Sequence, residues 1–214
     1  MPCSVCLRTR CNLPGRGSCQ YICPAGRVLS TSYRIPTVTI DPSNEIIVRA
    51  ATAQDAGMVA EIYNHYIRNT VVTFEEELVN ASDFVRRMQD VQSASFPWLV
   101  AEHNGIIAGY AYATAWKNRS AYQFSAEVTV YLHHSHGGKG IGSRLYSVLI
   151  PLLQDRGIHA LMGGIALPNE ASVALHEKFG FRKIAHFNEV GFKFNRWIDV
   201  GYWQRILDGT STTQ

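Results

Sequence analysis

The sequence has no cysteine after residue 23, although five lie before that point: Cys3, Cys6, Cys11, Cys19 and Cys23. No disulfide framework can therefore hold the remaining chain together, which is typical of a cytoplasmic protein. The sequence also lacks an apolar run near the ~18 residues that a membrane-spanning helix needs. We therefore expect no membrane partner.

The body of the chain has no net charge. Residues 1–45 carry five arginines and two acidic residues, which leaves 15 basic and 15 acidic residues in the rest of the chain. A neutral body lacks the basic footprint of a nucleic-acid-binding protein, so we expect a small molecule or a protein as the partner. The chain is 46% hydrophobic and 17% charged. This composition allows a sizeable core and excludes wholesale disorder.

Residues 1–45 form a separate segment, because they contain no acidic residue before Asp41 and show no sustained apolar period. Four interpretations are open: a disordered or wrongly included leader, an organellar transit peptide, a zinc knuckle and a secretory signal. The spacings Cys3-x2-Cys6 and Cys19-x3-Cys23 resemble those of zinc ligands. We expect a domain over residues 46–207 and a short tail over 208–214.

The body predicts an α/β domain with a mixed sheet. Asn104-Gly105 is a strong hairpin signal, Gly157 and Gly180 mark helix ends, and Pro151 should kink or disturb its helix. The expected strands are 46–50, 98–102, 106–116, 124–132, 159–167, 181–187 and 190–205. The expected helices start near 52, 80, 141 and 169.

A glycine-rich turn, residues 137–142, follows a strand and opens a helix. Its backbone N–H groups and the helix N-terminus can hold a pyrophosphate. A Walker A loop needs Ser or Thr after Lys139, where the chain has Gly140, and a dinucleotide fingerprint needs glycine at Ser143. The third pattern has glycines two apart, at 140 and 142, after a central strand. A turn without any ligand is the alternative.

Glu127 lies in a strand whose alternation places Ser125, Glu127, Thr129 and Tyr131 on one face. A carboxylate there can accept a proton from an attacking amine. A solvent-facing glutamate is the alternative, because that is the usual state of this residue.

Two residues near the last predicted helix are further candidates. Asn169 can cap this helix and reach a ligand, although a plain N-cap is an equal alternative. His176 lies two turns further along the same helix face and can protonate a leaving thiolate, because imidazole titrates near neutral pH.

Lys117 and Arg119 precede the strand of Glu127 and can hold an anionic substrate. A basic surface loop is the alternative. His133, His134 and His136 predict exposed rim imidazoles rather than a metal site, because no clear carboxylate or cysteine accompanies them. We expect no metal.

The body resembles the GNAT superfamily, and within it the phosphinothricin / methionine sulfoximine N-acetyltransferases, from about residue 46 to residue 207. The matching segments, in chain order, include Ile62-Tyr63-Asn64-His65-Tyr66, Thr73-Phe74, Pro97-Trp98-Leu99-Val100-Ala101-Glu102, Trp116-Lys117, Glu127, Gly138–Gly142, Asn169, Leu175-His176 and Gly191-Phe192-Lys193-Phe194.

This resemblance implies the GNAT (acyl-CoA N-acyltransferase) fold, in which two central strands of a mostly antiparallel sheet splay apart and helices flank the sheet. It implies acetyl-CoA as the co-substrate, held by Val130, Tyr131, Leu132, Gly138, Lys139, Gly140, Ile141, Gly142, Ser143 and Asn169. It also implies a homodimer and a role in herbicide resistance.

The resemblance implies that Glu127 is the general base. It also implies that His176 takes the place of the tyrosine that often protonates the thiolate in the superfamily. The acceptor would be the α-amine of phosphinothricin, methionine sulfoximine or methionine sulfone, in a pocket formed by Phe74, Lys117, Arg119 and Tyr122. Two alternatives stay open: another acceptor, such as a protein N-terminus or a polyamine, and a non-catalytic acyl-CoA sensor. Gly137 replaces the superfamily's usual Arg or Gln, so one phosphate contact is missing.

Overall fold

The computed structural model describes residues 21–22, 28–29 and 46–207. The chain divides into two compact units, residues 1–40 and 41–214. In the first unit, β1 (Tyr21–Ile22) pairs antiparallel with β2 (Val28–Leu29). The interpretations of the leader, its cysteine spacings and the tail over 208–214 concern residues that lie outside the described ones.

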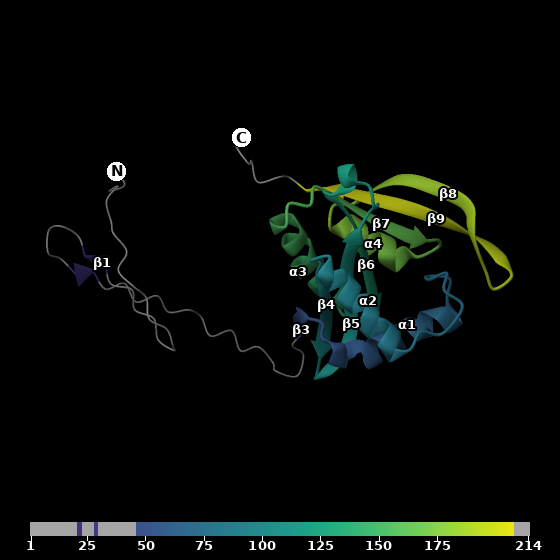
Figure 1. The fold of residues 1–214 in the computed structure, drawn as a ribbon, viewed down its shortest axis with the longest axis horizontal. Coiled ribbons are helices and arrows are strands. Elements are labelled where there is room, and N and C mark those ends of the chain that lie inside the picture. Colours follow the sequence, from purple (N-terminus) through teal and green to yellow (C-terminus); the bar gives the residue numbers. More distant parts are fainter. Residues whose placement is uncertain (1–20, 23–27, 30–45, 208–214) are drawn as a thin grey trace. The chain divides into compact units, whose positions relative to one another are not determined.

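The second unit is an α/β domain whose elements follow the predicted order (Figure 1). Its sheet has the strand order β3-β4-β5-β6-β7-β9-β8, and every neighbouring pair except β6 with β7 is antiparallel. The elements are β3 (Ile46–Ala50), α1 (Ala56–Asn69), α2 (Ala81–Ser93), β4 (Trp98–His103), β5 (Ile106–Ala115), β6 (Ser125–Leu132), α3 (Ile141–Asp155), β7 (Ala160–Ala166), α4 (Glu170–Lys178), β8 (Arg182–Lys193) and β9 (Arg196–Ile206).

The two central strands separate part-way along their length. Residues Ser125–Glu127 of β6 pair with Ala160–Met162 of β7, and the pairing stops there. The rest of β6 stays paired with β5 on its other side. Within the described residues, the edge of β6 that faces β7 has no strand partner beyond Glu127, so the backbone groups of this edge face the opening between the two strands. The predicted splayed strands are confirmed.

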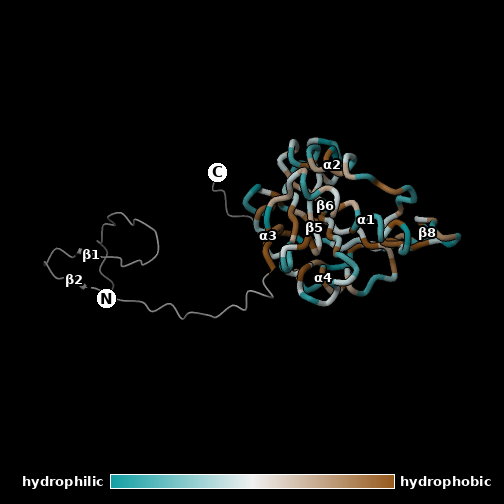
Figure 2. Tube along the Cα trace, turned by 90° about the horizontal axis from the view of Figure 1, so that it is seen from below, coloured by the Kyte–Doolittle hydropathy of each residue, from teal (hydrophilic) through white to brown (hydrophobic). Residues whose placement is uncertain are grey.

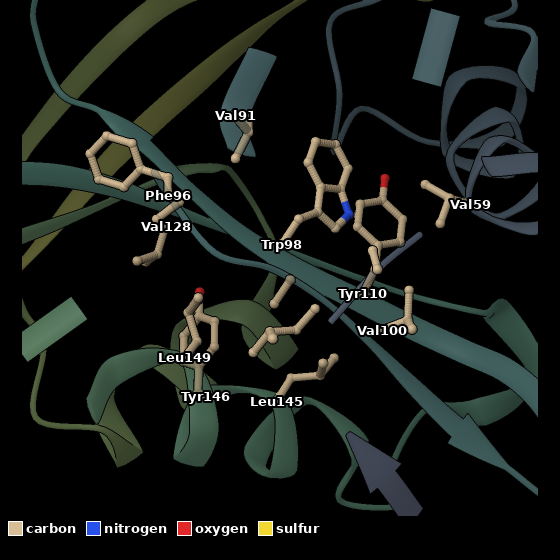
Figure 3. Close-up of a cluster of buried hydrophobic side chains, with 14 of the residues drawn as sticks. Val59, Val91, Phe96, Trp98, Val100, Tyr110, Val128, Leu145, Tyr146 and Leu149 are labelled. Atoms are coloured by element: carbon tan, nitrogen blue, oxygen red, sulfur yellow. The ribbon is translucent and has the colours of Figure 1, made fainter. Parts of the chain in front are cut away.

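Helices cover both faces of the sheet. Figure 2 shows β5 and β6 between α2 on one side and α4 on the other. In Figure 3, Leu145, Tyr146 and Leu149 of α3 point toward the strands, and all three are fully buried. On the other face, the ring of Phe84 from α2 packs edge-on against Trp98. None of the described helices is long and apolar enough to cross a membrane.

Local signals set the helix ends. The side chain of Asn169 accepts a hydrogen bond of 3.1 Å from the Ser172 N–H and caps α4. Gly180 follows α4 with φ of +80°, a left-handed conformation that favours glycine and ends the helix as predicted. α3 continues through Pro151 to Asp155, so this proline does not end the helix.

The last hairpin differs from the prediction. The sequence prediction ended one strand at residue 187 and began the next at 190, which is wrong, because β8 continues to Lys193. The hairpin turns at Phe194 and Asn195, whose φ values are +49° and +58°. At residues 187–191 the ladder shifts register instead, and the Glu189 N–H donates to Asp199 Oδ1 at 2.9 Å.

Candidate active site

A groove of about 610 Å³ lies along the end of β6, between the glycine-rich turn and α4. Its size lies within the range of small-molecule sites. Nine of the ten residues predicted to bind the cofactor line it, whereas Lys139 is exposed and is not part of the lining. Lining residues that the sequence analysis missed include Tyr66, Val72, Ala171, Ser172, Leu175 and Lys178.

The glycine turn forms one end of this groove. Gly138 and Gly140 have φ values of +74° and +79°, and no atom lies within 4 Å of the position that a Cβ would take at either residue. The turn leads directly into α3, so the N–H groups of the first helical turn face the groove. Such an end fits an anionic pyrophosphate.

The free edge of β6 forms one wall. Val130, Tyr131 and Leu132 line the groove with backbone that has no strand partner there among the described residues. The Tyr66 hydroxyl donates to the Leu132 carbonyl at 2.7 Å and ties α1 to this edge. An extended amide chain such as pantetheine can hydrogen-bond to the free backbone groups.

Glu127 lies where the two strands begin to separate. Its carboxylate is half-buried, and a Cβ placed on Gly164 of β7 would lie 3.2 Å from Glu127 Oε1. Burial raises the pKa of Glu127, and the Lys117 charge lowers it by a smaller amount. Glu127 is therefore more protected than the solvent-facing alternative assumes, and its perturbed pKa marks it as a candidate base.

The acceptor residues that the sequence predicts are not all brought together. Lys117 is exposed, and its Nζ lies 4.8 Å from the ring centre of Trp116. Arg119 and Tyr122 lie exposed at a short 3-10 turn (Ser120–Tyr122). Among the described contacts, Lys117 alone of these three acts on Glu127.

Phe74 lies in the loop between α1 and α2, which hydrogen bonds fix from two sides. The Tyr63 hydroxyl bonds to Thr73 Oγ1 at 2.7 Å. The buried Lys193 donates from β8 to the Thr73 carbonyl at 2.8 Å and to the Glu75 carbonyl at 3.0 Å. No sequence spacing links Lys193 to this loop, so sequence reasoning missed the connection.

A family model for the acetyltransferase (GNAT) domain matches residues 48–201. The chain belongs to the GNAT acetyltransferase family. It is 40% identical over 161 residues to a phosphinothricin N-acetyltransferase of Streptomyces viridochromogenes, which covers 75% of this chain and 87% of that relative. It is 37% identical to the L-amino acid N-acyltransferase MnaT of Escherichia coli, and the match covers 75% of this chain and 94% of that relative.

A solved GNAT structure of similar shape is a phosphinothricin acetyltransferase from Sinorhizobium meliloti in complex with AcCoA. It has a TM-score of 0.75 and 35% identity, and it covers 78% of this chain and 92% of that one. The predicted family, fold and acetyltransferase class are confirmed. The glycine turn and the free β6 edge of this GNAT enzyme fit acetyl-CoA as co-substrate, with pyrophosphate at the former and pantetheine along the latter.

His176 of this GNAT enzyme lies behind β7, on the opposite face of the sheet from Glu127. It packs on Gly163, whereas Glu127 contacts the neighbouring Gly164, and successive strand residues point to opposite faces. It is 3% exposed and does not line the groove. Its Nδ1 bonds to the Ser172 carbonyl at 2.8 Å, so Nε2 accepts from the Tyr146 hydroxyl at 3.1 Å. Burial lowers the pKa of His176, which favours this neutral form.

The imidazoles after β6 stack at the rim of the groove. The rings of His133 and His134 lie 4.3 Å apart, and His134 stacks on His65 of α1 at the same distance. The His133 ring accepts from the Ser135 N–H and so caps the turn before the glycine loop. In the described part of the chain, no group of three or more His, Cys, Asp or Glu side chains could hold a metal ion.

Proposed function

We propose that this GNAT acetyltransferase transfers the acetyl group of acetyl-CoA to the α-amine of a small amino-acid-like acceptor such as phosphinothricin, methionine sulfoximine or methionine sulfone. One observation carries the proposal. The half-buried carboxylate of Glu127 lies at the opening between β6 and β7, close enough to Lys117 for that cation to act on it. The acceptor class follows the printed names of the relatives.

The residues divide the work as follows. An α-amine is largely protonated at pH 7, so Glu127 accepts a proton from it. Lys117 pairs with the acceptor's carboxylate or phosphinate. The new C–N bond forms as the C–S bond of the thioester breaks, and free N–H groups of the β6 edge stabilise the developing negative charge on oxygen.

The proton for the departing thiolate has a less direct source. The family resemblance predicts His176 as this source, but both of its ring nitrogens are engaged in hydrogen bonds. Ser172 lines the groove, and its hydroxyl lies 3.5 Å from His176 Nδ1. This hydroxyl cannot relay a proton from His176, because the neutral ring holds its one proton on Nδ1 against the Ser172 carbonyl. In our proposal, solvent in the groove protonates the thiolate.

Thiol release from acetyl-CoA tests the function, with phosphinothricin, methionine sulfoximine, a polyamine and a short peptide as parallel acceptors. We expect release with the first two. Glu127→Gln should lower turnover at saturating acceptor by at least ~10²-fold, the usual scale of general-base catalysis. Near-full turnover by this variant would refute the role of Glu127.

The alternatives make different predictions in this assay. Lys117 and Arg119 would repel a polyamine, so release with the polyamine alone would refute a cationic pocket for the acceptor's anionic group. Release with the peptide alone would keep the fold and cofactor but change the acceptor. Binding of acetyl-CoA without release on any amine would favour the sensor, which the missing side chain at Gly137 suggested.

We also propose that the enzyme is a homodimer that acts in the cytoplasm and confers herbicide resistance by acetylating phosphinothricin. The long β8–β9 hairpin projects from the domain in two views (Figures 1 and 2). It exposes large apolar side chains: Ile184, Phe187, Val190, Phe192, Phe194 and Trp197. An apolar concentration of this kind supports an interface with a second copy. The lack of cysteine in residues 46–207 supports a reducing compartment.

A further inference from the structure

Tyr202 lies beside Glu127 on the same face of the sheet. In the strand register, Tyr202 of β9 lies opposite Gly164 of β7. A Cβ built on Gly164 would be 3.2 Å from Glu127 Oε1 and 3.2 Å from Tyr202 Cζ, the carbon that carries the hydroxyl. Glu127 Oε1 and Tyr202 Cζ therefore lie at most twice that distance apart, on either side of a residue that has no side chain.

The phenol ring is held in place. Trp116 contacts it edge-on at 5.4 Å between ring centres, and Phe187 does so at 5.8 Å. Trp116 in turn carries the Lys117 ammonium over its own ring. Tyr202 thus connects the general base to the residues that we place around the acceptor's anionic group.

The hydroxyl of Tyr202 has no hydrogen-bond partner among the residues that the structure describes, and the side chain is half-buried. Burial and the nearby Glu127 carboxylate both raise the pKa of Tyr202, so the phenol is neutral at physiological pH. A neutral phenol oxygen can accept a hydrogen bond from an amine.

We propose that Tyr202 orients the acceptor amine for attack. This inference rests on the proposed function. Glu127 first takes the extra proton of the ammonium and passes it to solvent. The Tyr202 oxygen then accepts one N–H of the neutral amine and the Glu127 carboxylate accepts the other, which leaves the nitrogen lone pair directed at the thioester carbon. The C–N bond then forms as the C–S bond breaks, and Tyr202 keeps its own proton throughout. Glu127 takes the proton of its own N–H as the C–N bond forms. One nitrogen that makes hydrogen bonds of about 2.7–3.2 Å on two sides can bridge two such oxygens, and the upper bound on the distance from Glu127 Oε1 to Tyr202 Cζ allows this arrangement.

This arrangement also sets a specificity. A primary amine offers two N–H groups beside its lone pair, one for each oxygen, whereas a secondary amine offers one. The site should therefore favour primary amines, and an N-methylated acceptor should lose the contact with Tyr202.

The experiment compares Tyr202→Phe with the unaltered enzyme, using the acceptor that the thiol-release assay identifies. We expect kcat/KM for this acceptor to fall by up to about tenfold, the scale of one hydrogen bond between neutral groups. KM for acetyl-CoA and the melting temperature should stay unchanged. The acid limb of the pH profile should also stay in place, because a neutral phenol adds no charge beside Glu127.

Two comparisons separate orientation from packing. Tyr146→Phe removes a tyrosine hydroxyl from the opposite face of the sheet, where it bonds to His176. It should lower the melting temperature rather than the acceptor kcat/KM. With the N-methylated acceptor, Tyr202→Phe and the unaltered enzyme should have nearly the same kcat/KM.

Three outcomes would overturn the inference. If the unaltered enzyme is active and Tyr202→Phe matches it on the primary amine, Tyr202 plays no part, although the proposed function stands. A shifted acid limb would mean that Tyr202 acts through the pKa of Glu127 instead. If the unaltered enzyme acetylates no amine at all, the proposed function fails, and this inference fails with it.

Discussion

At the scale of single residues, burial and the Lys117 charge together determine the pH range in which Glu127 can act. Burial raises the pKa of Glu127 above its ordinary 4.5, and the Lys117 charge opposes that rise. The base works only when deprotonated, so activity is lost as the pH falls through this pKa. We expect Lys117→Met to raise the pKa further and move the acid limb of kcat/KM to higher pH.

The measurement is kcat/KM for the acceptor across the acid range. The position of the limb reports the charge effect, whereas its height also reports lost acceptor binding. Lys183→Met is a matched control, because this lysine contacts His186 and the ring of Trp203. An acid limb that stays in place in Lys117→Met would contradict the electrostatic coupling.

The same scale shows what a sequence can reveal about a site. Glu127 was predictable because strand alternation and a family match fall on one residue. Tyr202 was not, because it reaches Glu127 only through the strand register that pairs it with Gly164. His176 matched the family spacing, but no helix period reveals that its ring packs on Gly163 behind the sheet.

At the scale of elements, the glycine turn binds an anion with backbone alone, and one position can be improved. Gly137 has φ of −60° and ψ of 149°, which any residue adopts, and nothing lies within 4 Å of the place of its Cβ. We expect Gly137→Arg to lower the Kd for CoA several-fold by adding a charge-assisted phosphate contact. Calorimetric titration measures this.

Two controls accompany the arginine variant. Gly137→Ala should leave the Kd unchanged, because it fits the same backbone and adds no charge. The gain from arginine should shrink as salt rises, since exposed charges are screened. Equal Kd values for the arginine and alanine variants would show that this position does not face the phosphates.

The elements themselves were largely predictable, because most carry a clear local signal. Asn104-Gly105 gave the β4–β5 hairpin, and glycines marked the ends of α3 and α4. The last hairpin escaped prediction because its turn places Phe194, an apolar residue, in the left-handed region. A turn that lacks glycine has no strong sequence signature.

At the scale of the whole molecule, the buried His176 should make stability depend on pH. Its pKa in the folded chain lies below the ordinary 6.5, because burial disfavours the cation. As the pH falls through about 6.5, the unfolded chain therefore takes up a proton that the folded chain resists, and the free energy of unfolding falls. Thermal melting between pH 8 and pH 5 should show this loss.

His176→Gln removes one titrating group and should make that dependence shallower. It should also lower the melting temperature at the alkaline end, because the hydrogen bond to Tyr146 is lost. A variant whose melting temperature falls in parallel with the unaltered protein at every pH would show that His176 does not contribute to the acid sensitivity.

The exposed apolar side chains of the β8–β9 hairpin also predict how the whole molecule assembles. Trp197 is 61% exposed and Phe192 is 51% exposed, and their rings contact each other at 4.9 Å on the projecting hairpin. Beside them, a cleft of about 600 Å³ between α4 and β9 is lined partly by Val173, Trp197 and Ile198. Such a surface gains free energy when a second copy covers it.

We expect sedimentation velocity to show a dimer, and Phe192→Glu with Trp197→Glu to produce a monomer that keeps its melting curve. Ile106→Glu is the matched control, because Ile106 is 53% exposed at the β4–β5 hairpin and its substitution should leave the dimer intact.

Phe187 of the β8–β9 hairpin contacts Tyr202, so a partner there would lie next to the acceptor. The monomer should therefore show a higher KM for the acceptor and an unchanged KM for acetyl-CoA. A dimer that survives both glutamates would place the interface elsewhere on the chain.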